Sequence, residues 1–221
     1  MSFAKINMVV LILMVAMSGF IVNPALAHDK ASQTRNLSGF TEILAKGSGD
    51  VDVKIGDSFK VEVSGHAEDF EHISTEIEDG VLVIGSFPDN GRSNWRFKHG
   101  YVVTITMPKL DALYSRGSGD GRIVNLSANQ FKLEQRGSGD VQISGTCTEG
   151  TFNSSGSGDL EARGLACGIV EINSRGSGDV TMTVNGAVSL DLNGSGDVDL
   201  YGSPRITHMS SRGSGDVSII D

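Results

Sequence analysis

Basic residues are scarce in this sequence, which carries 18 Lys and Arg against 27 Asp and Glu and has a formal net charge of −9 at pH 7. A protein with a net negative charge repels phosphate backbones and anionic lipid headgroups. We therefore expect neither nucleic acid nor an anionic membrane surface among its partners.

Helix signals, catalytic motifs and late apolar runs are missing as well. No segment repeats its apolar residues with the 3.6-residue period of an amphipathic helix. The sequence has no Gly-x-Ser-x-Gly turn for a nucleophilic serine, and its five histidines are scattered without the spacing of metal ligands. We expect a protein that is not an enzyme, holds no cofactor and has no membrane span after residue 27.

The first 27 residues predict a secretory signal peptide. Lys5 gives a basic start, residues 8–17 are an apolar run, and Ala25-Leu26-Ala27 fits a small-residue cleavage site. An uncleaved membrane anchor is the alternative, although the apolar run is short for a span. We therefore expect an exported protein, located in the periplasm, at the cell surface or outside the cell.

One four-residue motif, Gly-Ser-Gly-Asp, organises the rest of the chain. It occurs seven times, and the last six copies follow one another at intervals of 18 to 20 residues. The copies begin at Gly47, Gly117, Gly137, Gly156, Gly176, Gly194 and Gly213. A fixed period of this size indicates one structural unit stacked on itself, and it is too short for a pair of helices.

Both flanks of the motif alternate as strands do. Val141, Gln142 and Ile143, for example, follow one copy in apolar, polar, apolar order, and the residue four positions before each copy is apolar in all seven. This period of two indicates strands with one buried face, and the glycines suit the corner between them. The sequence predicts an all-β fold, a single-stranded parallel β-helix with coils of about 19 residues.

The motif intervals divide the chain into segments. Residues 28–38 are polar and are expected to be flexible, whereas residues 39–108 hold a single motif copy and are expected to form an irregular N-terminal β layer. Residues 109–221 are expected to form the regular β-helix. Within the N-terminal layer, Asp79-Gly80 predicts a hairpin turn, and the acidic residues 66–72 predict a connector.

The two cysteines, Cys147 and Cys167, are 20 residues apart and should lie in neighbouring coils. Export permits oxidation, but directly stacked strand residues do not always reach disulfide geometry. A disulfide and two buried free thiols therefore both remain open.

The aspartates of the motif should form a column on the outside of the coils. In the regular array they are Asp120, Asp140, Asp159, Asp179, Asp197 and Asp216. Stacked carboxylates repel one another, and calcium held by carboxylates and loop carbonyls would relieve the repulsion. We instead expect the aspartates to cap backbone N–H groups and to pair with the Lys or Arg that precedes five copies. Calcium is the alternative cofactor.

The candidate binding residues are Arg92, Trp95, Arg96 and Lys98, in the longest segment without the motif. Trp95 could stack on a sugar ring, and an arginine could hold a carboxylate or phosphate. These residues predict a glycan, or an envelope or cell-surface protein, as the partner. The alternative is that Trp95 packs against the core. The last coil presents unpaired backbone groups, which predicts an end-to-end homo-oligomer.

The order of these segments resembles the putative auto-transporter adhesin family with a head GIN domain. After the signal peptide, the similarity is carried by residues 40–43, 47–51, 79–84 and 103–108 and by the serial Gly-Ser-Gly-Asp motifs. The resemblance implies an exported bacterial protein of β-helical fold with a wider N-terminal β layer. It assigns no catalytic residues.

We therefore expect a non-catalytic exported protein that acts as an adhesin-like interaction or scaffold protein of the envelope. One alternative is a polysaccharide-active β-helix enzyme that would use exposed acids such as Asp52, Glu161 and Asp199. The other alternative is a calcium-dependent extracellular module.

Overall fold

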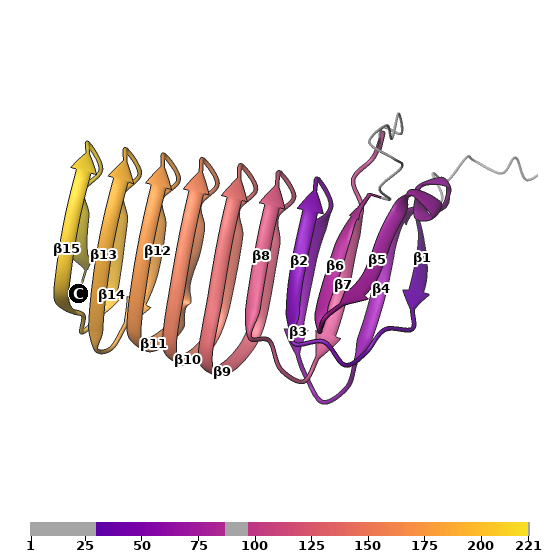
Figure 1. Ribbon diagram of the computed structural model, residues 1–221, viewed down its shortest axis with the longest axis horizontal. Coiled ribbons are helices and arrows are strands. Elements are labelled where there is room, and N and C mark those ends of the chain that lie inside the picture. The colour runs from indigo at the N-terminus through magenta and orange to yellow at the C-terminus, as the bar shows by residue number, and fades with distance from the viewer. Residues whose placement is uncertain (1–29, 87–96, 221) are drawn as a thin grey trace, which may run out of the picture.

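The chain folds as a β-solenoid of about 5 turns, with 72% of the described residues in strands and 3% in helix. The structure is a computed structural model that describes residues 30–86 and 97–220. Within these ranges, sixteen strands form one continuous hydrogen-bonded sheet that winds around the core (Figure 1). The predicted all-β parallel β-helix is confirmed.

Each coil consists of a strand that enters a Gly-Ser-Gly-Asp corner and a strand that leaves it. The entering strands are β2 (Glu42–Gly47), β8 (Ala112–Gly117), β13 (Ala187–Gly194) and β15 (Arg205–Gly213). The leaving strands are β3 (Asp50–Ile55), β12 (Val180–Val184), β14 (Val198–Gly202) and β16 (Val217–Ile220). Three longer strands run from one corner to the next, β9 (Gly121–Gly137), β10 (Val141–Gly156) and β11 (Leu160–Gly176).

Equivalent apolar residues stack in register inside the coils. Val141 pairs with Leu160, and Leu160 pairs with Val180, in parallel strands. These three side chains are at most 1% exposed, as are Leu133 and Phe152 in the column opposite. The period-2 alternation therefore packs a continuous aliphatic core whose large side chains each stabilise the fold by about 1.5–3 kcal/mol.

The first motif copy belongs to the same column as the other six. Gly47 pairs with Gly117, and the backbone N–H of Asp120 donates to Oδ1 of Asp50 at 2.9 Å. The coil of residues 42–55 thus stacks directly on the coil that begins 70 residues later. The predicted boundary at residue 108 lies within this continuous stack.

The remaining N-terminal strands extend both faces of the solenoid beyond this first coil. On one face, β7 (Val102–Met107) pairs parallel with β3, β4 (Lys60–His66) pairs antiparallel with β7, and β1 (Lys30–Arg35) pairs antiparallel with β4. On the other face, β6 (Val81–Ser86) pairs parallel with β2, and β5 (Ile73–Glu78) pairs antiparallel with β6. The hairpin predicted at Asp79-Gly80 is confirmed, and both residues have positive φ, 49° and 82°.

One expectation for the N-terminal part is wrong. Residues 28–38 are not flexible throughout, because Lys30–Arg35 form strand β1 along the length of β4. The sequence of β1 has no apolar alternation that would predict a strand. The strand forms because its backbone groups pair with the free edge of β4. The connector at residues 66–72 contains the 3₁₀-helix η1 (Ala67–His72), which buries Phe70 to 9% exposure.

The last described coil, β15 and β16, is more exposed than the coils before it. Met209 and Ile219 are 50% and 53% exposed, whereas Leu190 and Leu200, their partners in the preceding coil, are 0% exposed. End-to-end association at this coil stays a prediction. The predicted signal peptide lies outside the described residues, and in the described part no helix is long and apolar enough to cross a membrane.

Candidate functional site

Most of the predicted binding loop lies outside the described residues, namely Arg92, Trp95 and Arg96. Lys98 is described and is exposed. The neighbouring His99 stacks on His66, with ring centroids 3.9 Å apart. The prediction of a binding site in this loop therefore stays a prediction.

A groove with a volume of about 760 Å³ crosses the face formed by the strands that enter the corners. It spans the strands from β2 to β15. Buried residues of its lining are Ala112, Phe131, Gly150 and Val170. Its exposed lining is mainly charged or polar and includes Lys132, Glu149 and Glu171, with Ile169 as an apolar exception at 53% exposure.

The stacked coils arrange the groove residues in straight rows. Because neighbouring strands are in register, each coil contributes one outward side chain to a row, about 4.8 Å from the next. One row that lines the groove consists of Glu42, Ala112, Lys132, Thr151, Glu171 and Ser189. A repeated fold thus displays a non-repeated series of side chains along the solenoid axis.

Tyr114 is the aromatic residue at the partly exposed surface of this groove. The Nζ atom of Lys132 lies 5.3 Å from the centre of its ring. Burial raises the pKa of Tyr114 above its ordinary value near 10, and the charge of Glu42 and its hydrogen bond with the tyrosine raise the pKa further. The phenol therefore stays neutral at physiological pH, and its partly exposed ring has the ammonium group of Lys132 over it.

Amide and carboxylate side chains lie next to one another along the same face. Gln130 donates from Nε2 to Oε2 of Glu149 at 3.1 Å. Asn173 donates from Nδ2 to Oδ1 of Asn153 and to Oε1 of Glu171, each at 3.0 Å. These bonds hold the side chains in place, while their remaining donors and acceptors can still bond to ligand hydroxyl groups.

The acids considered as catalytic candidates lie in one outward row on the opposite face. Asp52, Glu161 and Asp199 occupy equivalent positions after the corner and are separated by three and two coils. These separations correspond to about 14 and 10 Å. Paired carboxyl groups of glycosidases are about 5–9.5 Å apart, so the strand spacing puts Asp52 and Glu161 beyond that range and Glu161 and Asp199 at its upper limit.

Each aspartate of the motif caps the corner of the next coil. Its Oδ1 accepts the backbone N–H of the following motif aspartate, as in Asp159 to Asp140 at 2.8 Å and Asp179 to Asp159 at 2.9 Å. Six such bonds join Asp50, Asp120, Asp140, Asp159, Asp179, Asp197 and Asp216. The capping interpretation is confirmed.

The second role expected of these aspartates, pairing with the preceding basic residue, is wrong for the described part of the chain. Arg116 and Arg136 instead pair with Glu134, at 3.4 and 2.8 Å, on the other side of the corner. Over residues 30–86 and 97–220, no group of three or more His, Cys, Asp or Glu could hold a metal ion. The absence of a cofactor stays a prediction, with calcium as its alternative.

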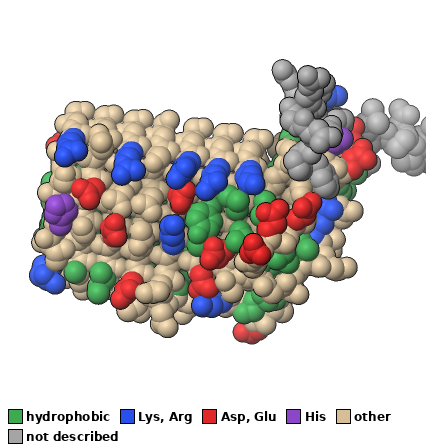
Figure 2. All heavy atoms as spheres, in the orientation of Figure 1, with side chains coloured by type: hydrophobic (Ala, Val, Ile, Leu, Met, Phe, Trp, Pro, Cys, Tyr) green, Lys and Arg blue, Asp and Glu red, His purple; other side chains and the backbone are tan. Residues whose placement is uncertain are grey.

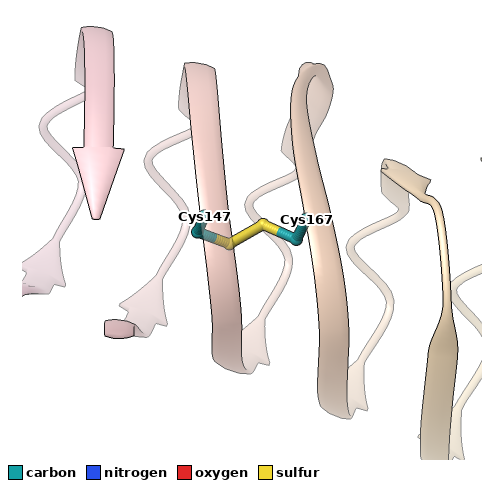
Figure 3. Close-up of a disulfide and its surroundings, with 2 residues drawn as sticks. All are labelled: Cys147 and Cys167. Atoms are coloured by element: carbon teal, nitrogen blue, oxygen red, sulfur yellow. A yellow bond between two sulfur atoms is a disulfide. The ribbon is translucent and has the colours of Figure 1, made fainter. Parts of the chain in front are cut away.

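A disulfide joins Cys147 of β10 to Cys167 of β11 and links two neighbouring coils (Figure 3). The two residues are direct register partners, with Cα atoms 4.5 Å apart. The two alternatives that the sequence left open are thereby resolved in favour of the bonded form. The bond lies close to the groove, because a side chain at Gly150 would stand 3.2 Å from Sγ of Cys147.

The groove itself is absent from the sequence-based expectations, which favoured the longest segment without the motif. The signal was present in the outward positions of the strands. Glu42, Lys132 and Glu171 each stand five residues before a motif copy, which places them in one row.

Comparisons with known proteins are consistent with this architecture. A family model described as "Putative auto-transporter adhesin, head GIN domain" matches residues 39–204. The fold is similar to a crystal structure from Bacteroides fragilis described as a putative adhesin, with a TM-score of 0.66 and 23% identity over 87% of this chain and 97% of that chain.

A second similar crystal structure comes from Parabacteroides distasonis and is described as a putative lipid binding protein. Its TM-score is 0.52, with 20% identity over 88% of this chain and 98% of that chain. At these identities the likeness shows the fold alone. No curated protein matches the chain.

Proposed function

Because this chain belongs to the family described as putative auto-transporter adhesin, head GIN domain, we propose that it is an adhesin-like exported protein that binds a saccharide chain in the groove. The proposal assigns no catalytic step. A similar structure from Bacteroides fragilis is itself described as a putative adhesin.

The shape and lining of the groove support a saccharide ligand. The groove runs across the coils, so an extended chain can contact several strands, and Tyr114 offers a ring for stacking on the apolar face of a sugar. Gln130 with Glu149 places an amide next to a carboxylate in the groove lining, a combination that can bond to neighbouring hydroxyls. The observation that carries the proposal is an aromatic ring and an ordered amide–carboxylate pair in the lining of one groove.

A glycan array followed by titration calorimetry on the hits tests the proposal. We expect binding of neutral saccharides, and we expect Tyr114→Ala to weaken it about tenfold, because stacking on the ring is lost. Tyr201→Ala is the matched control, since Tyr201 lies on the face of the strands that leave the corners and does not line the groove.

Two results would contradict the proposal. One is equal loss of binding in both tyrosine variants, which would show that the groove is not the site. The other is cleavage of a bound saccharide. If chromatography detects shorter saccharides after the protein is incubated with a glycan that it binds, the protein is an enzyme.

A further inference from the structure

Basic side chains form a row along the edge of the groove face that is nearest the corners. The residues that precede the seven motif copies are in register from coil to coil: Lys46, Arg116, Arg136, Ser155, Arg175, Asn193 and Arg212. The five basic members, all of them exposed, are here called the basic row. Figure 2 shows Lys and Arg side chains gathered in a row along the upper part of this face.

The basic row is long, straight and narrow. Seven coils are six steps of about 4.8 Å, so it extends over roughly 29 Å along the solenoid axis. Acidic side chains border it on both sides. Glu134 and Asp191 lie one row further along the face, and the capping aspartates lie beyond the corner. The positive surface is therefore a strip about one residue wide in an otherwise acidic protein.

The structure holds part of this strip in place without covering it. Glu134, whose side chain is 14% exposed, pairs with both Arg116 and Arg136. The two arginine side chains are still 46% and 61% exposed. A partly buried carboxylate thus fixes two guanidinium groups that stay exposed and can bind an anion in a bidentate way through their remaining N–H donors.

The fold does not need basic residues at these positions. Ser155 and Asn193 occupy the same register position in two of the coils. Within the described residues, no ion pair or hydrogen bond to another side chain engages Lys46, Arg175 or Arg212. Stacked like charges disfavour folding slightly, so the row is better explained by a ligand than by stability.

We propose that the basic row binds a linear anionic polysaccharide, one that carries carboxylate or sulfate groups at regular intervals and lies along the solenoid axis. A narrow strip fits a single polymer chain. A bilayer surface is broad and would bring Glu134, Asp191 and the capping aspartates against anionic headgroups. This site goes beyond the proposed groove function, because it uses other residues and a charged ligand.

Binding can be measured by calorimetry with oligogalacturonate as the carboxylated probe, dextran sulfate as the sulfated probe and dextran as the neutral control. We expect both anionic probes to bind and to be released at high salt, whereas any binding of dextran belongs to the groove and should not depend on the basic row. In the double variant Lys46→Glu/Arg175→Glu, affinity for the anionic probes should fall about tenfold or more.

The matched control is Lys54→Glu/Arg122→Glu, which makes the same change of charge at two exposed residues of the opposite face. The affinity of this control for the anionic probes should stay within about twofold of the parent. The control has the same net charge as the row variant, but its basic row is intact. Circular dichroism and thermal melting establish that both variants fold.

The inference is overturned if neither anionic probe binds, or if the two double variants lose affinity equally. Stronger binding to phosphatidylglycerol vesicles or to single-stranded DNA than to the polysaccharides would also overturn it, in favour of a membrane or nucleic-acid surface. Binding of neutral saccharides that depends on Tyr114, without binding of anionic ones, would refute the basic row alone. Binding of anionic polysaccharides that depends on the basic row, without binding of neutral saccharides, would refute only the groove function.

Discussion

The carbonyl oxygen of Gly117 occupies the space in which a side chain of Gly137 would begin. A Cβ atom on Gly137 would lie 1.8 Å from that oxygen, far inside any permitted contact. The φ angle of Gly137 is also positive, 141°. The first position of the motif therefore requires glycine for two reasons. The corner needs a positive φ angle, and the backbone of the neighbouring coil leaves no room for a side chain.

We predict that Gly137→Ala destabilises the protein by about 3 kcal/mol or more, because strain at positive φ adds to the overlap with Gly117. Urea unfolding followed by circular dichroism measures the change. A loss below about 1 kcal/mol would mean that neighbouring corners can separate without affecting the stack.

Gly121 provides the opposite case within the same coil. It stands in the column of Val51 and Val141, and a Cβ there would meet a methyl group of Val141 at an ordinary 3.4 Å. Gly121→Ala should raise the free energy of unfolding by about 0.5–1 kcal/mol, since it lowers the entropy of the unfolded chain. Destabilisation in the same urea experiment would contradict the assigned packing.

The hydrogen bonds between successive motif aspartates predict that the stability of the fold depends on the acceptor oxygen of each side chain more than on its negative charge. Asp159→Ala removes the oxygen that accepts the backbone N–H of Asp179 and should cost about 1 kcal/mol. Asp159→Asn keeps an acceptor oxygen and removes a repulsive charge, so its stability should stay within about 0.5 kcal/mol of the parent.

The same pair of variants tests whether calcium acts on the motif aspartates. If the melting temperature rises on addition of calcium in the parent but not in Asp159→Asn, the carboxylate charge binds an ion in addition to capping. If the capping role is sufficient, thermal melting with calcium and with chelator should give equal temperatures in all three proteins.

The disulfide between Cys147 and Cys167 closes a loop of 20 residues. Replacing both cysteines by alanine should lower the free energy of unfolding by about 3 kcal/mol, because the unfolded chain regains the freedom that the bond removes. Mass spectrometry after alkylation without reductant supplies the control. Labelling of both thiols in the purified native protein would contradict the bonded state.

Alkaline pH should destabilise the protein through Tyr101, which is 2% exposed and packs against the first corner. Burial raises the pKa of Tyr101, and the charge of Asp50 raises it further. Above the ordinary tyrosine pKa of about 10, the unfolded chain therefore loses this proton more readily than the folded protein, and stability falls as pH rises.

Urea unfolding measures the free energy of unfolding at a series of pH values, from neutral pH to above the ordinary pKa of tyrosine. Tyr101→Phe should flatten the decline, because phenylalanine does not ionise. The control variant Tyr201→Phe, at a partly exposed tyrosine, should leave the slope as in the parent, and equal slopes in all three proteins would contradict a role for Tyr101.

The regular coils could be predicted in detail because their determinants are local and repeated. The glycines, the capping aspartates and the alternation around Val141, Leu160 and Val180 occur in every coil, so one alignment yields strand, corner and register together. The dry interior follows from that register, since residues of the same kind come to lie on one another.

The remaining features depend on chain segments that meet only after folding. The placement of Gly47 on Gly117 and the pairing of β1 with β4 are contacts that no local pattern specifies, and the repeat places the cysteines in neighbouring coils without deciding whether they bond. The groove arises from stacking as well, because it brings side chains from distant coils to within about 5 Å of one another. The positions of the basic row can be read from the residue before each motif copy. Only the structure shows that these side chains do not pair with the motif aspartates, because they lie on the other side of the corner, where they form an exposed positive strip on a chain with a net charge of −9.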